Sequence, residues 1–308
     1  MYRSGGIYTL KKMEEEIDLY FFRCYDEDKY DQRRVKMKKI LASLMMVGLI
    51  FCLGGCNVPW MKQKTEKTKA AKVQADKVEG TMKGMKLKVG VSNDMAPFSY
   101  YDSEQKKITG FDIDLLDKLS EYLGFEYELY PMNMKKLEQK IKNKELDLAI
   151  AGISITDERQ REFSFTDTYY ETYLQIVVRK DSQITDRTEK KVGVVEGTSS
   201  AQYAEDYLSE DNKITYYKNI TKVWNDLEKG TIDATIYDTT GIQNYMQEHA
   251  DNTNLSVLNE QLNSEESNYG IMFVKGYKYL DQFNVALQVL NNDGTYQKLK
   301  EQWIKTKE

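Results

Sequence analysis

The chain has 308 residues, 41% of them hydrophobic and 30% charged, and its formal net charge is −5 at pH 7. This composition is typical of a globular protein with room for about two domains. Acidic and basic residues alternate through the body, without a long basic stripe or a recognition motif on a folded segment, so we expect no nucleic-acid partner.

Cysteine and histidine are scarce, which excludes several kinds of site. The cysteines are Cys24, Cys52 and Cys56, and none follows Asn57, so the body has neither an internal disulfide nor a cysteine-based zinc site. The single histidine, His249, lies in a polar stretch that we expect at the surface. A histidine-dependent triad or a histidine-rich metal site is thereby excluded, and we expect no metal and no cofactor.

Residues 37–56 have the pattern of a secreted lipoprotein's signal peptide. A basic Met-Lys-Lys precedes an apolar run at 40–53 that is too short to span a bilayer comfortably, and Gly-Gly-Cys56 follows. The ending Leu-Gly-Gly-Cys resembles the bacterial lipobox, which implies that Cys56 is acylated and becomes the new N-terminus. The alternative interpretations are a membrane-spanning anchor and a chance hydrophobic run.

The flanks of this signal are not expected to fold. Residues 1–36 precede the start of the signal, and we interpret them as an over-extended start of translation. Residues 57–85 are polar and rich in lysine, so they cannot bury enough apolar surface to fold alone. We predict a flexible tether there, whose cations favour an anionic membrane surface.

The body alternates predicted strands and helices twice over. Strands at 87–91, 125–130 and 148–153 enclose two helical patterns, and strands at 191–195, 214–217 and 232–238 repeat the arrangement. This pattern predicts two α/β lobes, each a mostly parallel sheet flanked by helices. Extended segments at 173–178 and 269–274 are long enough to cross between them, and two C-terminal helical patterns are expected to return to the first lobe. The predicted boundaries are 86–173 plus 272–308 for lobe 1 and 174–271 for lobe 2.

One stretch of lobe 1 carries groups suited to a small carboxylate. A buried strand ends at Gly152, Ser154 follows, and Thr156 is placed to cap a short helix that contains Arg159. Backbone N–H groups and a hydroxyl can donate to a carboxylate, and a guanidinium can grip both of its oxygens. The alternative is a capped helix followed by an arginine exposed on the surface.

Lobe 2 offers the complementary groups at its own strand ends, where open α/β sheets bind ligands. Gly197, Thr198 and Ser199 form a loop before a helix, and Asp238 ends a buried strand. A helix N-terminus favours an anion, and a carboxylate accepts from an ammonium. Together with Arg159 this set predicts a site for a zwitterion such as a free α-amino acid. Asp238 could equally be the N-cap of a helix that starts at Thr239, and the two roles are compatible.

Several ordered motifs of the body resemble one family. They are Gly-Phe-Asp-Ile-Asp-Leu at 110–115, Gly-Ile-Ser-Ile-Thr-Asp-Glu-Arg at 152–159, Phe-Ser-Phe-Thr-Asp-Thr-Tyr-Tyr at 163–170, Val-Gly-Val with Gly-Thr at 192–198, and Asp-Gly-Thr-Tyr-Gln-Lys at 293–298. From about residue 86 to the end, the chain is similar to the bacterial extracellular solute-binding proteins of family 3, which serve polar amino-acid ABC transporters. The resemblance implies a hinge-closing, two-lobe fold of the type II periplasmic-binding-protein kind. It further implies that Arg159 takes the ligand α-carboxylate and Asp238 the α-ammonium, and that Gly152, Ser154, Thr198 and Ser199 bind the same groups.

The chain departs from the family at positions that face the ligand side chain. Many members that bind basic side chains have an acid in the first loop, where this chain has Ser92. Positions that are often aromatic are matched by Met95 and Met134. These residues weaken the case for an arginine or lysine ligand, and methionine's adaptable surface leaves the side chain undefined.

The function that these features predict is a lipid-anchored receptor on the extracellular face of the membrane. We expect a monomer that binds a polar amino acid and delivers it to the permease and ATPase subunits of an ABC transporter, without being an enzyme. The alternatives are an enzyme on the same scaffold, similar to a dehydratase, and a ligand sensor.

Overall fold

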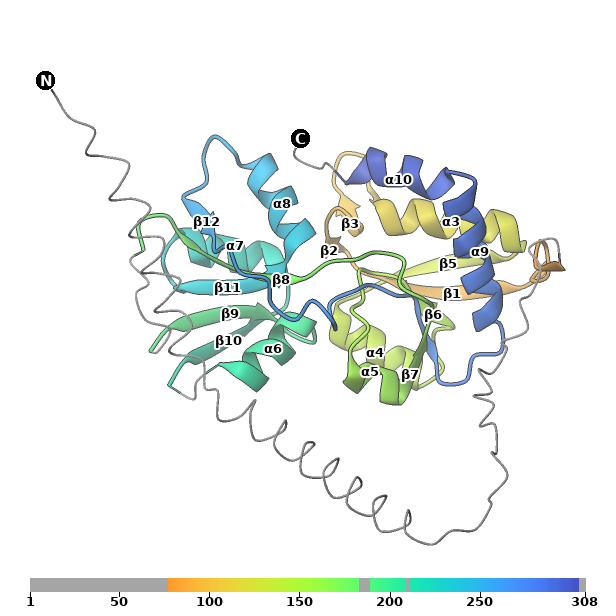
Figure 1. The fold of residues 1–308 in the computed structure, drawn as a ribbon, viewed down its shortest axis with the longest axis horizontal. Helices are drawn as coiled ribbons and strands as arrows, with labels where there is room; N and C mark the ends of the chain where they lie inside the picture. Colours follow the sequence, from red (N-terminus) through yellow and green to blue (C-terminus); the bar gives the residue numbers. More distant parts are fainter. Residues whose placement is uncertain (1–76, 183–188, 209–210, 305–308) are drawn as a thin grey trace, which may run out of the picture. The chain divides into compact units, whose positions relative to one another are not determined.

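The computed structural model describes residues 77–182, 189–208 and 211–304 (Figure 1). The predicted N-terminal extension, the signal peptide and Cys56 lie outside these ranges. The strands are β1 (Lys86–Val91), β2 (Asp94–Met95), β3 (Ser99–Asp102), β4 (Lys107–Thr109), β5 (Glu126–Pro131), β6 (Leu148–Ala149), β7 (Phe163–Phe165), β8 (Leu174–Arg179), β9 (Lys191–Val195), β10 (Lys213–Tyr217), β11 (Ala234–Asp238), β12 (Leu255–Val257) and β13 (Met272–Val274). The helices are α3 (Phe111–Leu123), α4 (Met134–Lys142), α5 (Asp157–Glu162), α6 (Ser199–Tyr207), α7 (Ile220–Glu228), α8 (Thr239–Glu248), α9 (Leu280–Asn292) and α10 (Thr295–Trp303).

Two five-stranded sheets form the cores of two lobes. The sheet of lobe 1 has the order β5-β1-β6-β13-β7, and that of lobe 2 has the order β10-β9-β11-β8-β12. In each sheet the first three strands are parallel to one another, and the last two run antiparallel to their neighbours. The α/β two-lobe fold predicted from the sequence is thereby confirmed.

The helices of lobe 1 follow from local sequence patterns. Helix α3 buries Phe111, Leu115 and Leu119 on one face, and it ends at Gly124, whose φ of 84° is the left-handed conformation that favours glycine. The C-terminal helices α9 and α10 both pack on α3, as predicted for the segment that returns to the first lobe (Figure 1). Helix α4 packs against β6 and β13.

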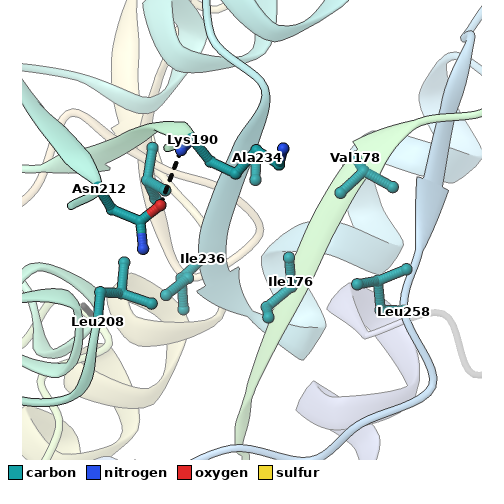
Figure 2. Close-up of a pocket in the computed structure, with 9 residues that line it drawn as sticks. Ile176, Val178, Lys190, Leu208, Asn212, Ala234, Ile236 and Leu258 are labelled. Carbon is teal, nitrogen blue, oxygen red and sulfur yellow. Dashed lines mark hydrogen bonds between the residues drawn. The ribbon is translucent and has the colours of Figure 1, made fainter. Parts of the chain in front are cut away.

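In lobe 2, α6 packs on β9 and β11, and α7 and α8 pack on the other face of the sheet (Figure 1). Beside α6, an apolar hollow lies over the sheet, and Figure 2 shows the side chains that surround it. Its lining residues are Ile176, Val178, Lys190, Val192, Leu208, Asn212, Ala234, Ile236 and Leu258. None of them belongs to the residues predicted to bind ligand.

Two neighbouring segments connect the lobes. The backbones of Tyr170 and Tyr269 are bridged, with the Tyr269 amide donating to the Tyr170 carbonyl at 2.8 Å. Further along, the Leu262 and Leu174 backbones exchange hydrogen bonds of 2.8 and 2.9 Å. A pair of connections joined in this way suits a hinge, because a few residues can absorb the rotation of one lobe against the other.

The folded body starts earlier than the predicted end of the tether. Val78 and Met82 are buried, and the Met82 amide donates to the carbonyl of Leu123 at 2.9 Å. The predicted tether, which ended at Met85, was therefore too long at its C-terminal end. The apolar side chains of Val78 and Met82 are four residues apart and pack with α3 instead of remaining in solvent. Within the described ranges, no helix is long and apolar enough to cross a membrane.

Candidate ligand-binding site

The loop after β6 brings the predicted residues of lobe 1 to the sheet edge. Gly152 has a φ of +56°, and its amide donates to Oδ2 of the buried Asp112 at 2.7 Å. A Cβ at this position would lie 3.0 Å from Cε of Met95 and 3.3 Å from the ring of Tyr269. The backbone conformation therefore favours glycine, and the close contacts leave little room for a larger residue.

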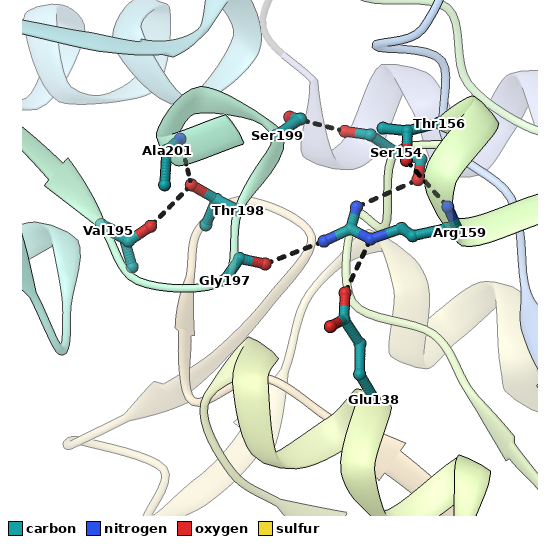
Figure 3. Close-up of polar contacts among 9 residues, drawn as sticks. All are labelled: Glu138, Ser154, Thr156, Arg159, Val195, Gly197, Thr198, Ser199 and Ala201. Carbon is teal, nitrogen blue, oxygen red and sulfur yellow. Dashed lines mark hydrogen bonds and ion pairs between the residues drawn. The ribbon is translucent and has the colours of Figure 1, made fainter. Parts of the chain in front are cut away.

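Arg159 lies in α5 and is buried, with 8% of its surface exposed. Thr156 caps this helix by accepting from the Arg159 amide, which confirms the predicted N-cap. The guanidinium donates through Nε to Glu138, through Nη1 to the carbonyl of Ser154, and through Nη2 to the carbonyl of Gly197, at 2.7, 3.0 and 2.8 Å (Figure 3). The alternative of an exposed surface arginine is wrong, because these acceptors from both lobes hold the side chain inside the protein.

A guanidinium has five N–H groups. The three acceptors around Arg159 leave one N–H on each terminal nitrogen without a hydrogen-bond partner among the described residues. A pair of N–H groups on Nη1 and Nη2 is the set of donors that a carboxylate can engage with both oxygens.

Hydroxyl groups from the two lobes meet beside Arg159. Ser154 and Ser199 are both buried, and their Oγ atoms lie 2.9 Å apart (Figure 3). Thr198 is the N-cap of α6: its hydroxyl accepts from the Ala201 amide and donates to the carbonyl of Val195. The Thr198 side chain is thus engaged in shaping the helix start, whereas Ser199 reaches lobe 1.

Asp238 ends β11 at the N-cap position of α8, but its side chain makes no capping hydrogen bond. It is 4% exposed, and its Oδ1 has no hydrogen-bond partner among the described residues. Burial raises the pKa of Asp238 to about 6, and the neighbouring Tyr269 hydroxyl and the charge of Arg159 oppose that rise. The hydroxyl of Tyr269 is also buried without a partner of good geometry. A buried carboxylate oxygen without a donor is costly, and a ligand ammonium would satisfy it.

The remaining predicted residues all lie in lobe 1. Met95, in β2, is buried over Gly152, and its sulfur accepts a hydrogen bond from the Tyr237 hydroxyl of lobe 2 at 2.9 Å. Ser92 lies between β1 and β2. It is buried, and its hydroxyl donates to Oδ1 of Asp94 at 2.8 Å. Met134 begins α4, one helical turn before Glu138, and packs partly buried against a neighbouring apolar cluster.

Residues that the sequence reasoning did not assign also shape this region. Glu138 and Asp112 anchor Arg159 and Gly152, and Tyr237 and Tyr269 border Met95 and Asp238. Asp112 belongs to the motif at 110–115, one of those that resemble the family, but the motif alone assigned it no role. Glu138 could have been found from the sequence by its position four residues after Met134, which places both on one face of the helix. No neighbouring residue indicates that Tyr237 and Tyr269 belong to the site.

Within the described ranges, no three histidine, cysteine, aspartate or glutamate side chains come together as a metal site would require. Apart from Asp238, the carboxylates near Arg159 are bound to protein donors. Glu196 pairs with Lys135 across the lobes, and Glu138 pairs with Arg159.

Comparison with known proteins identifies the family. Residues 87–306 match the family described as bacterial extracellular solute-binding proteins, family 3. The chain belongs to this family, as its motifs indicated. The match spans both lobes and includes all the residues predicted to bind ligand.

Individual relatives are similar over most of the chain. The arginine-binding extracellular protein ArtP of Bacillus subtilis is 30% identical, covering 71% of this chain and 86% of that protein. The L-cystine-binding protein TcyJ of Escherichia coli is also 30% identical, covering 71% of this chain and 82% of that protein. Among solved structures, an ancestral arginine-binding protein bound to arginine is 31% identical with a TM-score of 0.65, covering 71% of this chain and 98% of that one.

Proposed function

We propose that this protein is an extracellular receptor that binds one free α-amino acid between its lobes and delivers it to an ABC transporter. The site residues are those named above: Arg159, Ser154, Gly152 and Ser92 with Met95 and Met134 from lobe 1, and Asp238, Thr198 and Ser199 from lobe 2. The family and the amino-acid ligands of its relatives support this function.

One observation carries the proposal. Arg159 keeps two unused N–H groups, and Asp238 keeps a buried oxygen without a donor, at the junction of the two lobes. An α-carboxylate satisfies the first and an α-ammonium the second. A free amino acid carries both groups on one carbon, so one ligand neutralises both residues at once.

The same geometry explains how binding would favour closure. Arg159 of lobe 1 contacts the Gly197 carbonyl of lobe 2, and Ser154 contacts Ser199. A ligand held between Arg159 and Asp238 makes contacts with both lobes only when they are together, so it stabilises the closed state by differential binding. The closed receptor, a monomer anchored through a lipid on Cys56, then docks on the permease subunits, and the ATPase subunits drive transport.

Substitution of Arg159 tests the function directly. We expect Arg159→Met to weaken amino-acid binding by several kcal/mol, about the cost of truncating one partner of a buried charge pair. The matched control is Arg161→Met, because Arg161 lies two positions further along α5 and is exposed. Calorimetric titration should use the chain from Asn57 onward, unfolded and refolded to remove carried-over ligand. Near-normal affinity of a folded Arg159→Met protein contradicts the assignment.

A dehydratase-like enzyme is the second candidate, and the titration distinguishes it from a receptor. The relatives named above are binding proteins by their names. Besides Asp238, the carboxylates near Arg159 are paired with protein donors, which does not suit general acid–base work. Recovery of the unchanged amino acid after prolonged incubation is expected, and its conversion to product would favour the enzyme.

A further inference from the structure

The loop between β9 and α6 of lobe 2 lies against the first turn of α4 in lobe 1. Gly197, in this loop, has a φ of +76°. A Cβ on Gly197 would lie 2.9 Å from the backbone nitrogen of Lys135 and 3.1 Å from its Cα, which is too close for either backbone to stay where it is. The two lobes therefore come this close only because residue 197 has no side chain.

The same loop also makes two polar contacts with lobe 1. The carbonyl of Gly197 accepts from Nη2 of Arg159 at 2.8 Å (Figure 3). The neighbouring Glu196 forms an ion pair with Lys135. Lys135 belongs to α4 and Arg159 to α5, so the loop is held against two helices of the opposite lobe by groups of the protein itself.

The steric contact and the ion pair differ in strength. The side chain of Lys135 is 66% exposed and that of Glu196 is 35% exposed, so water and salt screen their attraction. A methyl group pressed against the backbone of a helix is not screened, and it can be accommodated only by moving one segment away from the other. We therefore expect Gly197 to determine how far the lobes close, and the ion pair to adjust the closure only slightly.

From these contacts we infer that Gly197, Glu196 and Lys135 form a latch that sets the closure equilibrium of the two lobes. The bare backbone at Gly197 lets the loop lie on α4, and this position brings the Gly197 carbonyl to Arg159. Part of the free energy of closure then comes from the lobes themselves. Resting on the proposed function, ligand affinity should consequently depend on Lys135 and Glu196, which are outside the proposed set of ligand-binding residues.

The separation of the lobes tests the latch without a ligand. The chain from Asn57 onward has no cysteine, so nitroxide labels can be attached at Gln139→Cys in α4 and Asp206→Cys in α6, which are both exposed. In the refolded protein, double electron–electron resonance should show a population at the short distance of the closed state. Gly197→Ala should lower the ratio of closed to open molecules on the order of tenfold, as overpacking does.

Gly294→Ala is the matched control for this variant. Gly294 has a φ of +82°, and a Cβ there meets nothing within 4 Å, so the substitution has the same backbone cost without touching the other lobe. Its label distances should equal those of the natural protein. A folded Gly197→Ala protein with the same distance distribution as Gly294→Ala overturns the latch.

Titration separates failure of the latch from failure of the proposed function. The probes are the common L-amino acids and L-cystine, and the one that the natural protein binds most tightly is used for the variants. Gly197→Ala should bind it on the order of tenfold more weakly than Gly294→Ala does. Equal affinities contradict the latch and leave the receptor function standing. If the folded natural protein binds none of the probes, the receptor function fails, and the label distances alone decide the latch.

A charge swap tests the ion pair. Lys135→Glu places two carboxylates together and should lower the ratio of closed to open molecules by about two- to fivefold at low salt. Adding Glu196→Lys should restore the ratio, because the pair is then present with its charges exchanged. A change confined to α4 would not be restored by a substitution in the other lobe. Failure of the folded double variant to regain closure contradicts the place of the ion pair in the latch.

Discussion

Glu138 accepts a hydrogen bond from Nε of Arg159 at 2.7 Å, across a separation of 21 residues in the sequence. This contact holds one edge of the guanidinium against α4. The terminal nitrogens are thereby turned toward the carbonyls of Ser154 and Gly197 and toward the proposed ligand position. Glu138 is thus a positioning residue, which acts on a ligand through the orientation of Arg159.

Removing the charge of Glu138 should weaken ligand binding without unfolding the protein. We expect Glu138→Gln, which keeps an acceptor oxygen but loses the charge, to lower amino-acid affinity by about 1 kcal/mol, because the acceptor of Arg159 Nε is then neutral and holds the guanidinium less firmly. The control is Glu145→Gln, because Glu145 also pairs with a cation of α4, Lys140, but lies exposed. Calorimetric titration of both variants decides the point, and equal affinities in the two would show that Glu138 has no positioning role.

The close contacts of Gly152 lead to a second prediction. Gly152→Ala should cost about 1–2 kcal/mol of stability for a left-handed alanine, and the new methyl group should also press on Met95 and Tyr269. Amino-acid binding should weaken in addition, because this loop presents Ser154 beside Arg159.

Gly276→Ala is the matched control for this substitution. Gly276 has a φ of +75°, and a Cβ there meets nothing within 4 Å. Chemical denaturation of Gly276→Ala therefore measures the cost of the left-handed backbone conformation alone. The ligand affinity of this variant should stay normal. If both alanine variants bind ligand equally well, the packing of Met95 over Gly152 has no part in the site.

Asp112 should make the stability of the ligand-free protein depend on pH. Burial raises its pKa from 3.8 to about 7, even though Tyr169 and the Gly152 amide oppose the rise. The folded state then holds the proton more tightly than the unfolded state does. The stabilisation is complete below the unfolded pKa of 3.8 and is lost as the pH rises to about 7.

Asp112→Asn removes this titration while keeping an oxygen that can accept from Gly152. The free energy of unfolding of the natural protein minus that of the variant should therefore fall between pH 4 and 7, by up to about 1.4 kcal/mol per pH unit, and level off above. Denaturation with urea at several pH values measures it. Asp251→Asn, at an exposed position, is the control. A difference that rises with pH would contradict the raised pKa.

Asp238 should instead make ligand binding depend on pH. Its pKa in the ligand-free protein is about 6, and the proposed ammonium contact requires the ionised carboxylate. Affinity should therefore be level above about pH 7 and fall by about tenfold per pH unit well below 6. Binding near pH 6 should release a proton, which titrations in buffers of different ionisation enthalpy detect. Asp238→Asn should bind weakly with a flat profile, and a natural protein with constant affinity down to pH 4.5 would remove Asp238 from the ammonium site.

Much of the fold is determined by local sequence. The spacing of Phe111, Leu115 and Leu119 and the glycine at 124 specify α3, and Thr156 specifies the start of α5, because periodicity and capping involve residues within a few positions of each other. The order of the motifs was sufficient to indicate the family and both lobes. It also indicated which residues to examine, including Arg159 and Asp238.

Only the tertiary structure decided how those residues are used. The sequence could not pair Arg159 with Glu138, bring Gly152 to Asp112, or place the Tyr237 hydroxyl against Met95, which is 142 residues away. It also placed the end of the tether too late, since burial of Val78 and Met82 depends on α3 being present to cover them. Caps and helical faces follow from neighbouring residues, whereas the pairing of buried charges depends on which distant segments the fold brings together. Only the folded chain therefore determines that Arg159 keeps N–H groups for an anion and that Asp238 keeps an oxygen for a cation.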